Sequence, residues 1–237
     1  MGGVTALLNL HEFSDRQALV KELAGKVASL LALSVEKKGR ASLAVSGGTT
    51  PVALFEHLSG MDIPWKDVVI FPVDERWVEP DDADSNERLV RTHLLKDRAA
   101  DAKFFGMKNS AATAGQGEEA CEELLKKVPL PFDVLILGMG GDGHTASLFP
   151  GAEKLAAAAD MNSGRKCMAL APVTAPHERM SLTLPVIISA SNIFLHIVGE
   201  EKKKVLEKAL EDGPAEEMPI RFVLRNTKRP VEVYWAP

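Results

Sequence analysis

The sequence predicts an α/β protein in which a mostly parallel sheet is covered by helices on both faces. Short, almost continuous apolar segments, such as residues 41–45 and 132–138, alternate along the chain with longer segments of helical periodicity. Strands that are apolar throughout are typical of parallel sheets buried on both faces. The chain has 237 residues and no long linker rich in glycine or proline, so we expect one domain over residues 1–237.

The first element with a clear period is a helix over residues 15–38. Leucine and valine residues recur within it at helical spacing, and Gly39 is a residue typical of the position just past a helix end. Ser14 and Gln17 have the spacing of a capping box, in which side chains bind the backbone N–H groups of the first turn. We therefore expect Ser14 to cap this helix.

The same reasoning predicts the remaining elements. Buried strands are expected at residues 41–45, 67–71, 132–138, 166–173, 180–184, 192–199 and 231–236. Helices are expected at residues 52–59, 86–95, 117–128 and 200–211, the last with Val205, Leu206 and Leu210 facing inward. Residues 74–85 are expected to form a long acidic loop, in which Asp84 or Ser85 caps the helix that follows.

Composition and charge exclude several classes of protein. The net charge of −5 gives no basic excess of the kind that nucleic-acid-binding proteins carry. No apolar stretch reaches the length of a membrane span, and the first residues lack the pattern of a signal peptide. The two cysteines, Cys121 and Cys167, fit a reducing compartment. We expect a cytoplasmic protein, monomeric or a small homo-oligomer, with neither a nucleic-acid nor a membrane partner.

Three polar loops follow predicted strands and carry the residues that could do chemistry. They span residues 46–51, 74–86 and 138–149. In open parallel sheets, ligands bind outside the carboxyl ends of the strands. Because each loop follows a strand, we expect the three loops to meet in one site.

The first loop reads SGGTTP and lies between a strand and a helix. Backbone N–H groups at Gly47 and Gly48 could bind an anion, and Ser46, Thr49 and Thr50 add hydroxyl donors. The loop lacks the lysine of a nucleotide P-loop, so a nucleoside triphosphate is not expected. A phosphate site and a tight turn that only needs glycine both fit this pattern.

The second loop begins with Asp74, Glu75 and Arg76 at the end of a strand. An arginine here could stabilise an oxyanion, and a solvated loop with an internal ion pair is the alternative. Two cations outside the loops are candidates as well, since Arg179 stands before a strand and Lys202 at a strand-to-helix junction. Each could bind a phosphate if it reaches the same cleft, and is otherwise a surface charge.

The third loop reads GMGGDGHTASLF, and its glycines have the spacing of a dinucleotide-binding turn. However, Asp142 and His144 interrupt the turn, and the acidic residue that such a site needs about 20 positions later does not follow a strand. A histidine suits general-base chemistry near neutral pH, and Asp142 could orient its ring. The alternative is an aspartate that caps a helix beside an incidental histidine. The other histidines share no metal-ligand spacing: His11, His57, His93, His177 and His196.

Together, these motifs resemble the 6-phosphogluconolactonase family. SGGTTP, DERWVEPDDADSN and LGMGGDGHTASLFPG occur in the order of that family, and ERMSLTLP is similar to a further family stretch. The resemblance runs from about residue 10 to the C-terminus, and the third motif is its most specific part. The segment MPIRFVLRN at residues 218–226 differs from the small polar residues usual in the family.

The resemblance implies a Rossmann-like fold shared with glucosamine-6-phosphate deaminase, and an ester hydrolase without metal or redox cofactor. The implied reaction is hydrolysis of 6-phospho-D-glucono-1,5-lactone to 6-phospho-D-gluconate in the oxidative pentose phosphate pathway. His144 would be the general base, Asp142 its neighbour and Arg76 the active-site arginine. The residues implied on the substrate and phosphate side are Ser46, Gly47, Gly48, Thr49, Thr50, Asp74, Arg179 and Lys202.

Two other functions use the same fold. A glucosamine-6-phosphate deaminase needs carboxylates to move a proton, and Asp74 could serve. However, that family carries a catalytic glutamate soon after its D-G-H motif, and here the first acid after His144 is Glu153. A sugar-phosphate sensor within a transcription regulator usually carries a helix-turn-helix domain, whereas the first 40 residues offer one long helix.

Overall fold

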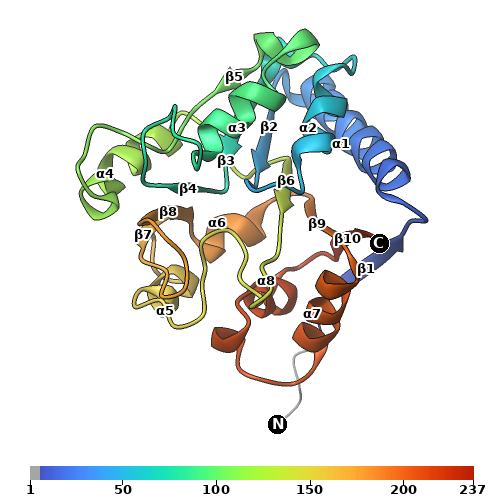
Figure 1. Cartoon of the computed structure of the whole chain (residues 1–237). Helices are drawn as coiled ribbons and strands as arrows, with labels where there is room; N and C mark the ends of the chain where they lie inside the picture. Colours follow the sequence, from blue (N-terminus) through green and yellow to red (C-terminus); the bar gives the residue numbers. More distant parts are fainter. Residues whose placement is uncertain (1–5) are drawn as a thin grey trace.

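A central parallel sheet organises the computed structural model, which describes residues 6–237. Within this range the strands of the sheet number seven, in the order β1-β10-β9-β6-β2-β3-β5, and every neighbouring pair is parallel (Figure 1). The strands are β1 (Leu8–Glu12), β2 (Ala41–Val45), β3 (Val68–Pro72), β5 (Lys103–Phe104), β6 (Val134–Leu137), β9 (Ile193–Val198) and β10 (Val231–Ala236). The predicted parallel sheet is therefore confirmed.

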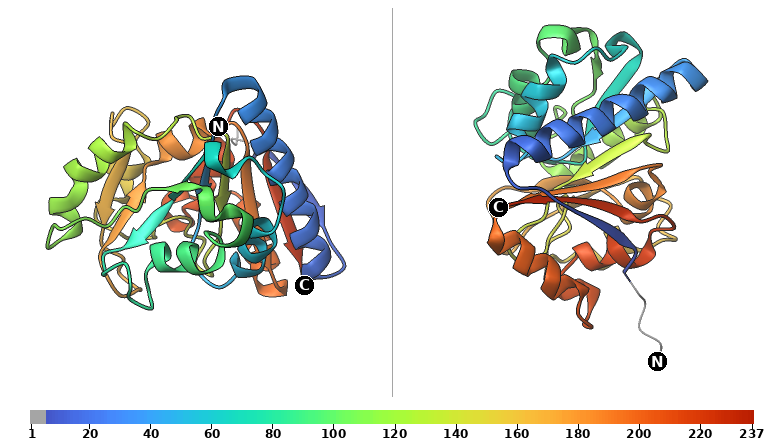
Figure 2. Two further views of the ribbon diagram at one scale, coloured as in Figure 1. Left: turned by 90° about the horizontal axis from the view of Figure 1, so that it is seen from above. Right: turned by 90° about the vertical axis from the view of Figure 1, so that its right-hand side faces the viewer.

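Helices cover both faces of this sheet. On one face, α1 (Arg16–Lys38), α2 (Val52–Ser59) and α3 (Asn86–His93) share an apolar core with Leu43 and Val45. On the other face, α6 (Leu184–Ser189), α7 (Glu200–Leu210) and α8 (Ile220–Asn226) share a second core with Ala44. Figure 2 shows the sheet edge-on, with α1 on one side and α7 on the other. Alternate residues of β2 thus enter different cores, which explains why the strand is apolar apart from Ser42.

A second, smaller sheet lies beside the central one. Within residues 6–237 it has three antiparallel strands in the order β4-β8-β7, with β4 (Asp74–Arg76), β7 (Cys167–Leu170) and β8 (Arg179–Leu182). The helix α4 (Ala114–Leu125) packs against β7 and β8. The prediction that residues 74–85 are loop throughout is wrong at its start, because Asp74–Arg76 pairs with β8. The strands predicted at residues 166–173 and 180–184 exist as β7 and β8, but they belong to the small sheet.

The long helix α1 has the predicted length but a different cap. Asp15, not Ser14, caps its start, and Oδ1 of Asp15 accepts the backbone N–H of Ala18 at 2.8 Å. At the other end Gly39 adopts the left-handed conformation, with φ at 69°, and its N–H reaches the carbonyl of Val35. The structure therefore confirms that Gly39 ends the helix, whereas the predicted capping box at Ser14 is wrong. Of the two residues proposed to cap α3, Ser85 is the one that does so.

Some short elements are not among those predicted. They include the strands β1 and β5 and the helices α5 (Leu155–Ala159), α6 and α8. No helix follows His144 directly, since the next one begins at Leu155, so the helix-cap interpretation of Asp142 is wrong. In α7 the inward face is formed by Leu206 and Ala209, whereas Leu210 is 42% exposed, contrary to the prediction. Among residues 6–237, no helix combines the length and apolarity that crossing a bilayer requires.

Candidate active site

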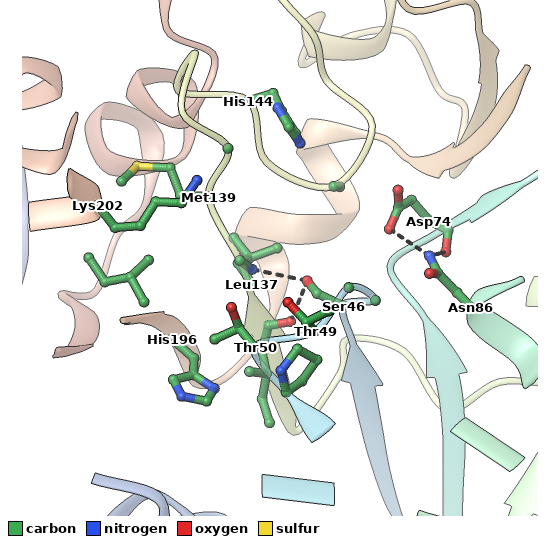
Figure 3. A pocket seen from close by; sticks show the side chains of 18 of the residues that line it. Ser46, Thr49, Thr50, Asp74, Asn86, Leu137, Met139, His144, His196 and Lys202 are labelled. Atoms are coloured by element: carbon green, nitrogen blue, oxygen red, sulfur yellow. Dashed lines mark hydrogen bonds between the residues drawn. The ribbon is translucent and has the colours of Figure 1, made fainter. Parts of the chain in front are cut away.

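The carboxyl ends of β2, β6 and β9 open into a cavity of about 410 Å³ (Figure 3). All three polar loops border this cavity, as their positions after strands predict. The candidate residues that line it are Ser46, Gly47, Gly48, Thr49, Thr50, Asp74, Arg76, His144, Arg179 and Lys202. Asp142 is the exception among the candidates, because it contacts His144 without lining the cavity.

His144 lines the cavity from the loop after β6 (Figure 3). Its Nδ1 lies 2.6 Å from Oδ1 of Asp142, and the same oxygen accepts the backbone N–H of His144 at 3.0 Å. The imidazole also stacks on Phe149, with the ring centroids 4.0 Å apart. With Nδ1 held by Asp142 and the ring held by Phe149, Nε2 is the nitrogen left free to act on a ligand.

The charge of Asp142 suits its position beside His144. Burial alone would raise the pKa of Asp142, but the backbone N–H and the ring of His144 outweigh burial and hold that pKa below its ordinary value. The carboxylate is therefore ionised at neutral pH. An ionised neighbour stabilises the positive charge that forms when the imidazole takes up a proton.

The glycines of this loop bring the backbone close to the histidine ring. A Cβ atom at Gly140 would overlap Nδ1 of His144, so only glycine fits there. Gly143 has a φ of 78°, and a Cβ atom there would lie 2.8 Å from Cβ of Met218. The carbonyl of Gly143 accepts the backbone N–H of Ile220 at 2.8 Å. The atypical segment 218–226 thus packs against the loop that carries His144.

The loop at residues 46–51 links two strand ends and leaves its glycines at the cavity. The hydroxyl of Ser46 donates to the carbonyl of Ile136 at 3.0 Å and accepts the N–H of Gly138 at 3.1 Å. Ser46 therefore fastens β2 to β6, and its hydrogen is already used. Gly48, with a φ of 88°, and Thr49 are exposed at the cavity, which leaves this part of the loop open to an anion.

Asp74 is buried and is bound by side chains from two other segments. Ser147 donates to its Oδ2 at 2.6 Å. Nδ2 of Asn86 donates to its backbone carbonyl at 2.8 Å, as Figure 3 shows. Asn86 also lines the cavity, and a Cβ atom at Gly47 would overlap its amide. Asp74 thus joins the second loop to the third, while Asn86 lies between Asp74 and Gly47 of the first.

The neighbouring Glu75 is fully buried and faces away from the cavity. Its carboxylate accepts the backbone N–H groups of Arg76, Asn86 and Glu87 at 2.7–2.8 Å, and the hydroxyl of Ser85. Burial nevertheless raises its pKa to about 7, against the effect of these hydrogen bonds. Glu75 anchors the start of α3 to β4, which makes it a structural residue, a role that the sequence did not predict for it.

Arg76 and Arg179 are direct partners across β4 and β8. Nη1 of Arg76 donates to the carbonyl of Asp84 at 2.6 Å, and Nη2 of Arg179 donates to the carbonyl of Pro176 at 3.0 Å. In the described range, 6–237, the Nε atom of each guanidinium is buried without a partner. Burial lowers the pKa of Arg179, and Arg76 lowers it further against the opposing charge of Asp74. Two adjacent guanidiniums with unused donors favour an anion in the cavity.

Lys202 lies in the first turn of α7 and lines the cavity on the side away from Asp74 (Figure 3). Three residues that sequence analysis did not single out line the cavity as well: Asn86, Phe149 and His196. Glu153, the first acid after His144, is exposed and is not among the lining residues. Over residues 6–237, no three His, Cys, Asp or Glu side chains are grouped closely enough to hold a metal ion.

Comparison with known proteins places the chain in a family. Residues 14–235 match the family described as glucosamine-6-phosphate isomerases/6-phosphogluconolactonase. The chain belongs to this family. A 6-phosphogluconolactonase from Rhizobium meliloti is 42% identical over 229 residues, which cover 97% of this chain and 99% of that relative. The family resemblance predicted from the motifs is thus confirmed.

Solved structures of the family agree with the fold. The crystal structure of a 6-phosphogluconolactonase from Shewanella baltica superposes with a TM-score of 0.96 at 47% identity and covers all of both chains. A monomeric glucosamine-6-phosphate deaminase superposes with a TM-score of 0.79 at 19% identity over 97% of each chain. That second likeness concerns the fold alone, and it confirms the deaminase-like architecture that was predicted.

Proposed function

We propose that this protein hydrolyses 6-phospho-D-glucono-1,5-lactone to 6-phospho-D-gluconate, the second step of the oxidative pentose phosphate pathway. The 6-phosphogluconolactonases to which it is similar support this activity. The observation that carries the chemistry is the 2.6 Å contact between Nδ1 of His144 and Oδ1 of Asp142. It leaves Nε2 of a histidine that lines the cavity free to act as a general base.

In the proposed reaction, a water molecule attacks the carbonyl carbon of the lactone while Nε2 of His144 accepts a proton from that water. The negative charge that develops on the carbonyl oxygen is stabilised by the guanidinium of Arg76. The imidazolium then returns the proton to the ring oxygen as the ester C–O bond breaks. Asp142 stabilises the imidazolium between these two steps.

The phosphate of the substrate would bind at the other side of the cavity. The backbone and hydroxyl groups of residues 47–50 and the ammonium of Lys202 supply donors there. Arg179, beside Arg76 on β8, adds positive charge to the cavity that favours a phosphorylated ligand. Binding at these groups would hold the lactone carbonyl beside His144. Because the lactone is already a reactive ester, such positioning supplies a large part of the rate acceleration.

The decisive experiment is a lactonase assay of the purified protein with freshly generated phospholactone. We expect saturable hydrolysis well above the spontaneous rate, and no ammonia release from glucosamine 6-phosphate. Ammonia release without lactone hydrolysis would overturn the proposal in favour of a deaminase. A shift of operator DNA at moderate salt without hydrolysis would favour the sensor.

A further inference from the structure

His196 is a buried polar side chain that the proposed reaction does not use. It lies on β9, is 3% exposed, and lines the same cavity as His144. In the part of the chain that the structure describes, neither of its ring nitrogens has a hydrogen-bond partner. Buried polar groups without partners are rare, because each one destabilises the folded protein. Such a residue facing a cavity points to a ligand that supplies the missing bonds.

The form of the imidazole defines what it can bind. Burial lowers the pKa of His196 to about 4, so the ring is neutral at neutral pH. A neutral imidazole always presents one N–H donor and one acceptor nitrogen. The groups around it on the same face of the sheet, Phe194 and Tyr234, belong to the apolar core that includes α1. Within residues 6–237 no group accepts this N–H, so the donor is available to a ligand in the cavity.

The position of His196 indicates which part of a ligand it meets. In Figure 3, His196 lies on the same side of the cavity as Thr50 and Lys202, whereas Asp74 and Asn86 lie on the opposite side. Thr50 and Lys202 are the residues assigned above to the phosphate. A phosphoryl oxygen is an acceptor that matches the N–H of a neutral imidazole.

We propose that His196 binds the phosphoryl end of the substrate by donating its ring N–H to a phosphoryl oxygen. The inference rests on the proposed function, and it adds a residue from β9 to the donors of the 47–50 loop and α7. It makes His196 a residue that selects phosphorylated over unphosphorylated lactones. Such a role predicts an effect on binding rather than on the chemical step.

The test compares two lactones in wild type and three variants. His196→Leu removes the donor, His196→Gln keeps an N–H near the position of Nε2, and Phe194→Leu perturbs the same face of β9 outside this cavity. For the phospholactone we expect His196→Leu to raise KM about tenfold with kcat within about twofold, as loss of one hydrogen bond to a charged group implies. His196→Gln should recover part of this loss, and Phe194→Leu should leave KM unchanged.

For glucono-1,5-lactone, which lacks the phosphate, we expect wild type and His196→Leu to have the same kcat/KM. An unchanged KM for the phospholactone, or an equal loss on both lactones, would overturn the inference. Calorimetric titration with 6-phosphogluconate and with gluconate provides a readout that does not depend on turnover. If wild type hydrolyses neither lactone, the proposed function fails, whereas equal affinity of wild type and His196→Leu for 6-phosphogluconate refutes the role of His196. Circular dichroism spectra confirm that each variant is folded.

Discussion

Ser147 donates a 2.6 Å hydrogen bond from Oγ to Oδ2 of Asp74, and both side chains are buried. The bond joins the loop that carries His144 to the strand that carries Arg76. It therefore fixes the separation between the proposed base and the proposed donor to the oxyanion. The proposed site depends on this connection between segments that are far apart in the sequence.

Replacing Ser147 by alanine should weaken both the fold and the activity. The change leaves a buried carboxylate oxygen of Asp74 without its donor, which costs about 1–3 kcal/mol in the free energy of unfolding. Urea denaturation would measure that loss, and kcat should fall severalfold because the His144 loop is no longer fixed. A matched control is Ser29→Ala, whose exposed hydroxyl bonds only to the carbonyl of Gly25. If both variants are equally stable, the hydrogen bond to Asp74 does not contribute to the free energy of unfolding.

Removing the imidazole of His144 should abolish most of the turnover. As the proposed base, it contributes roughly a hundredfold or more to kcat, so His144→Ala should lose at least that factor. The variant should still bind 6-phosphogluconate, because the proposed phosphate contacts come from other segments. Turnover close to wild type in His144→Ala would eliminate it as the base.

The substitution Asp142→Asn should reduce kcat by roughly tenfold or more. The reason is that an amide does not stabilise the imidazolium as a carboxylate does. The control is Asp160→Asn. Asp160 is an exposed aspartate that accepts the backbone N–H two residues later, as Asp142 does, but contacts no histidine. Steady-state kinetics of the two variants separate the charge effect from the turn. Wild-type kcat in Asp142→Asn would mean that the charge beside His144 is not needed.

The sequence predicted the sheet and the meeting of the three loops because both depend on local patterns. The strands β2 and β6 are apolar apart from Ser42, and their carboxyl ends lead directly into the SGGTTP and GMGGDGH segments. In a parallel sheet, neighbouring carboxyl ends lie at one edge, so the location of the site followed from the strand order along the chain. The candidate residues could therefore be named without a structure.

Elements whose charges are satisfied by distant partners could not be predicted in this way. Asp74–Arg76 has three charges in a row, which favours a loop, yet it forms β4 because Ser147 and the start of α3 bind its carboxylates. Arg221 in α8 is buried because it donates to carbonyls at the end of α7. Similarly, His196 stands in an apolar strand and carries no signal of the cavity beside it.

Gly140 should tolerate no side chain, although it is only half-buried in a glycine-rich turn. A Cβ atom there would overlap Nδ1 of His144, so Gly140→Ala should displace the ring from Asp142. We expect kcat to fall at least tenfold with little change in thermal stability, since a functional group is misplaced by only a small distance. The adjacent Gly141→Ala is the control, because a Cβ atom at that position meets nothing within 4 Å. Equal activities of the two variants would contradict the crowding argument.

Glu75 should make the protein less stable as the pH rises. Its pKa is raised by burial from 4.5 to about 7, so between these values the folded state binds more protons than the unfolded chain. The contribution of Glu75 to stability is therefore full below about pH 4.5 and is lost as the pH rises through 7, by up to about 3 kcal/mol. Glu75→Gln does not titrate, so its unfolding free energy relative to wild type should increase between pH 5 and pH 8. Urea denaturation at both pH values measures this difference, with the exposed Glu153→Gln as the control that should follow wild type. A constant difference between Glu75→Gln and wild type would mean that the carboxylate stays ionised in the folded protein, held by the three backbone N–H groups that it accepts.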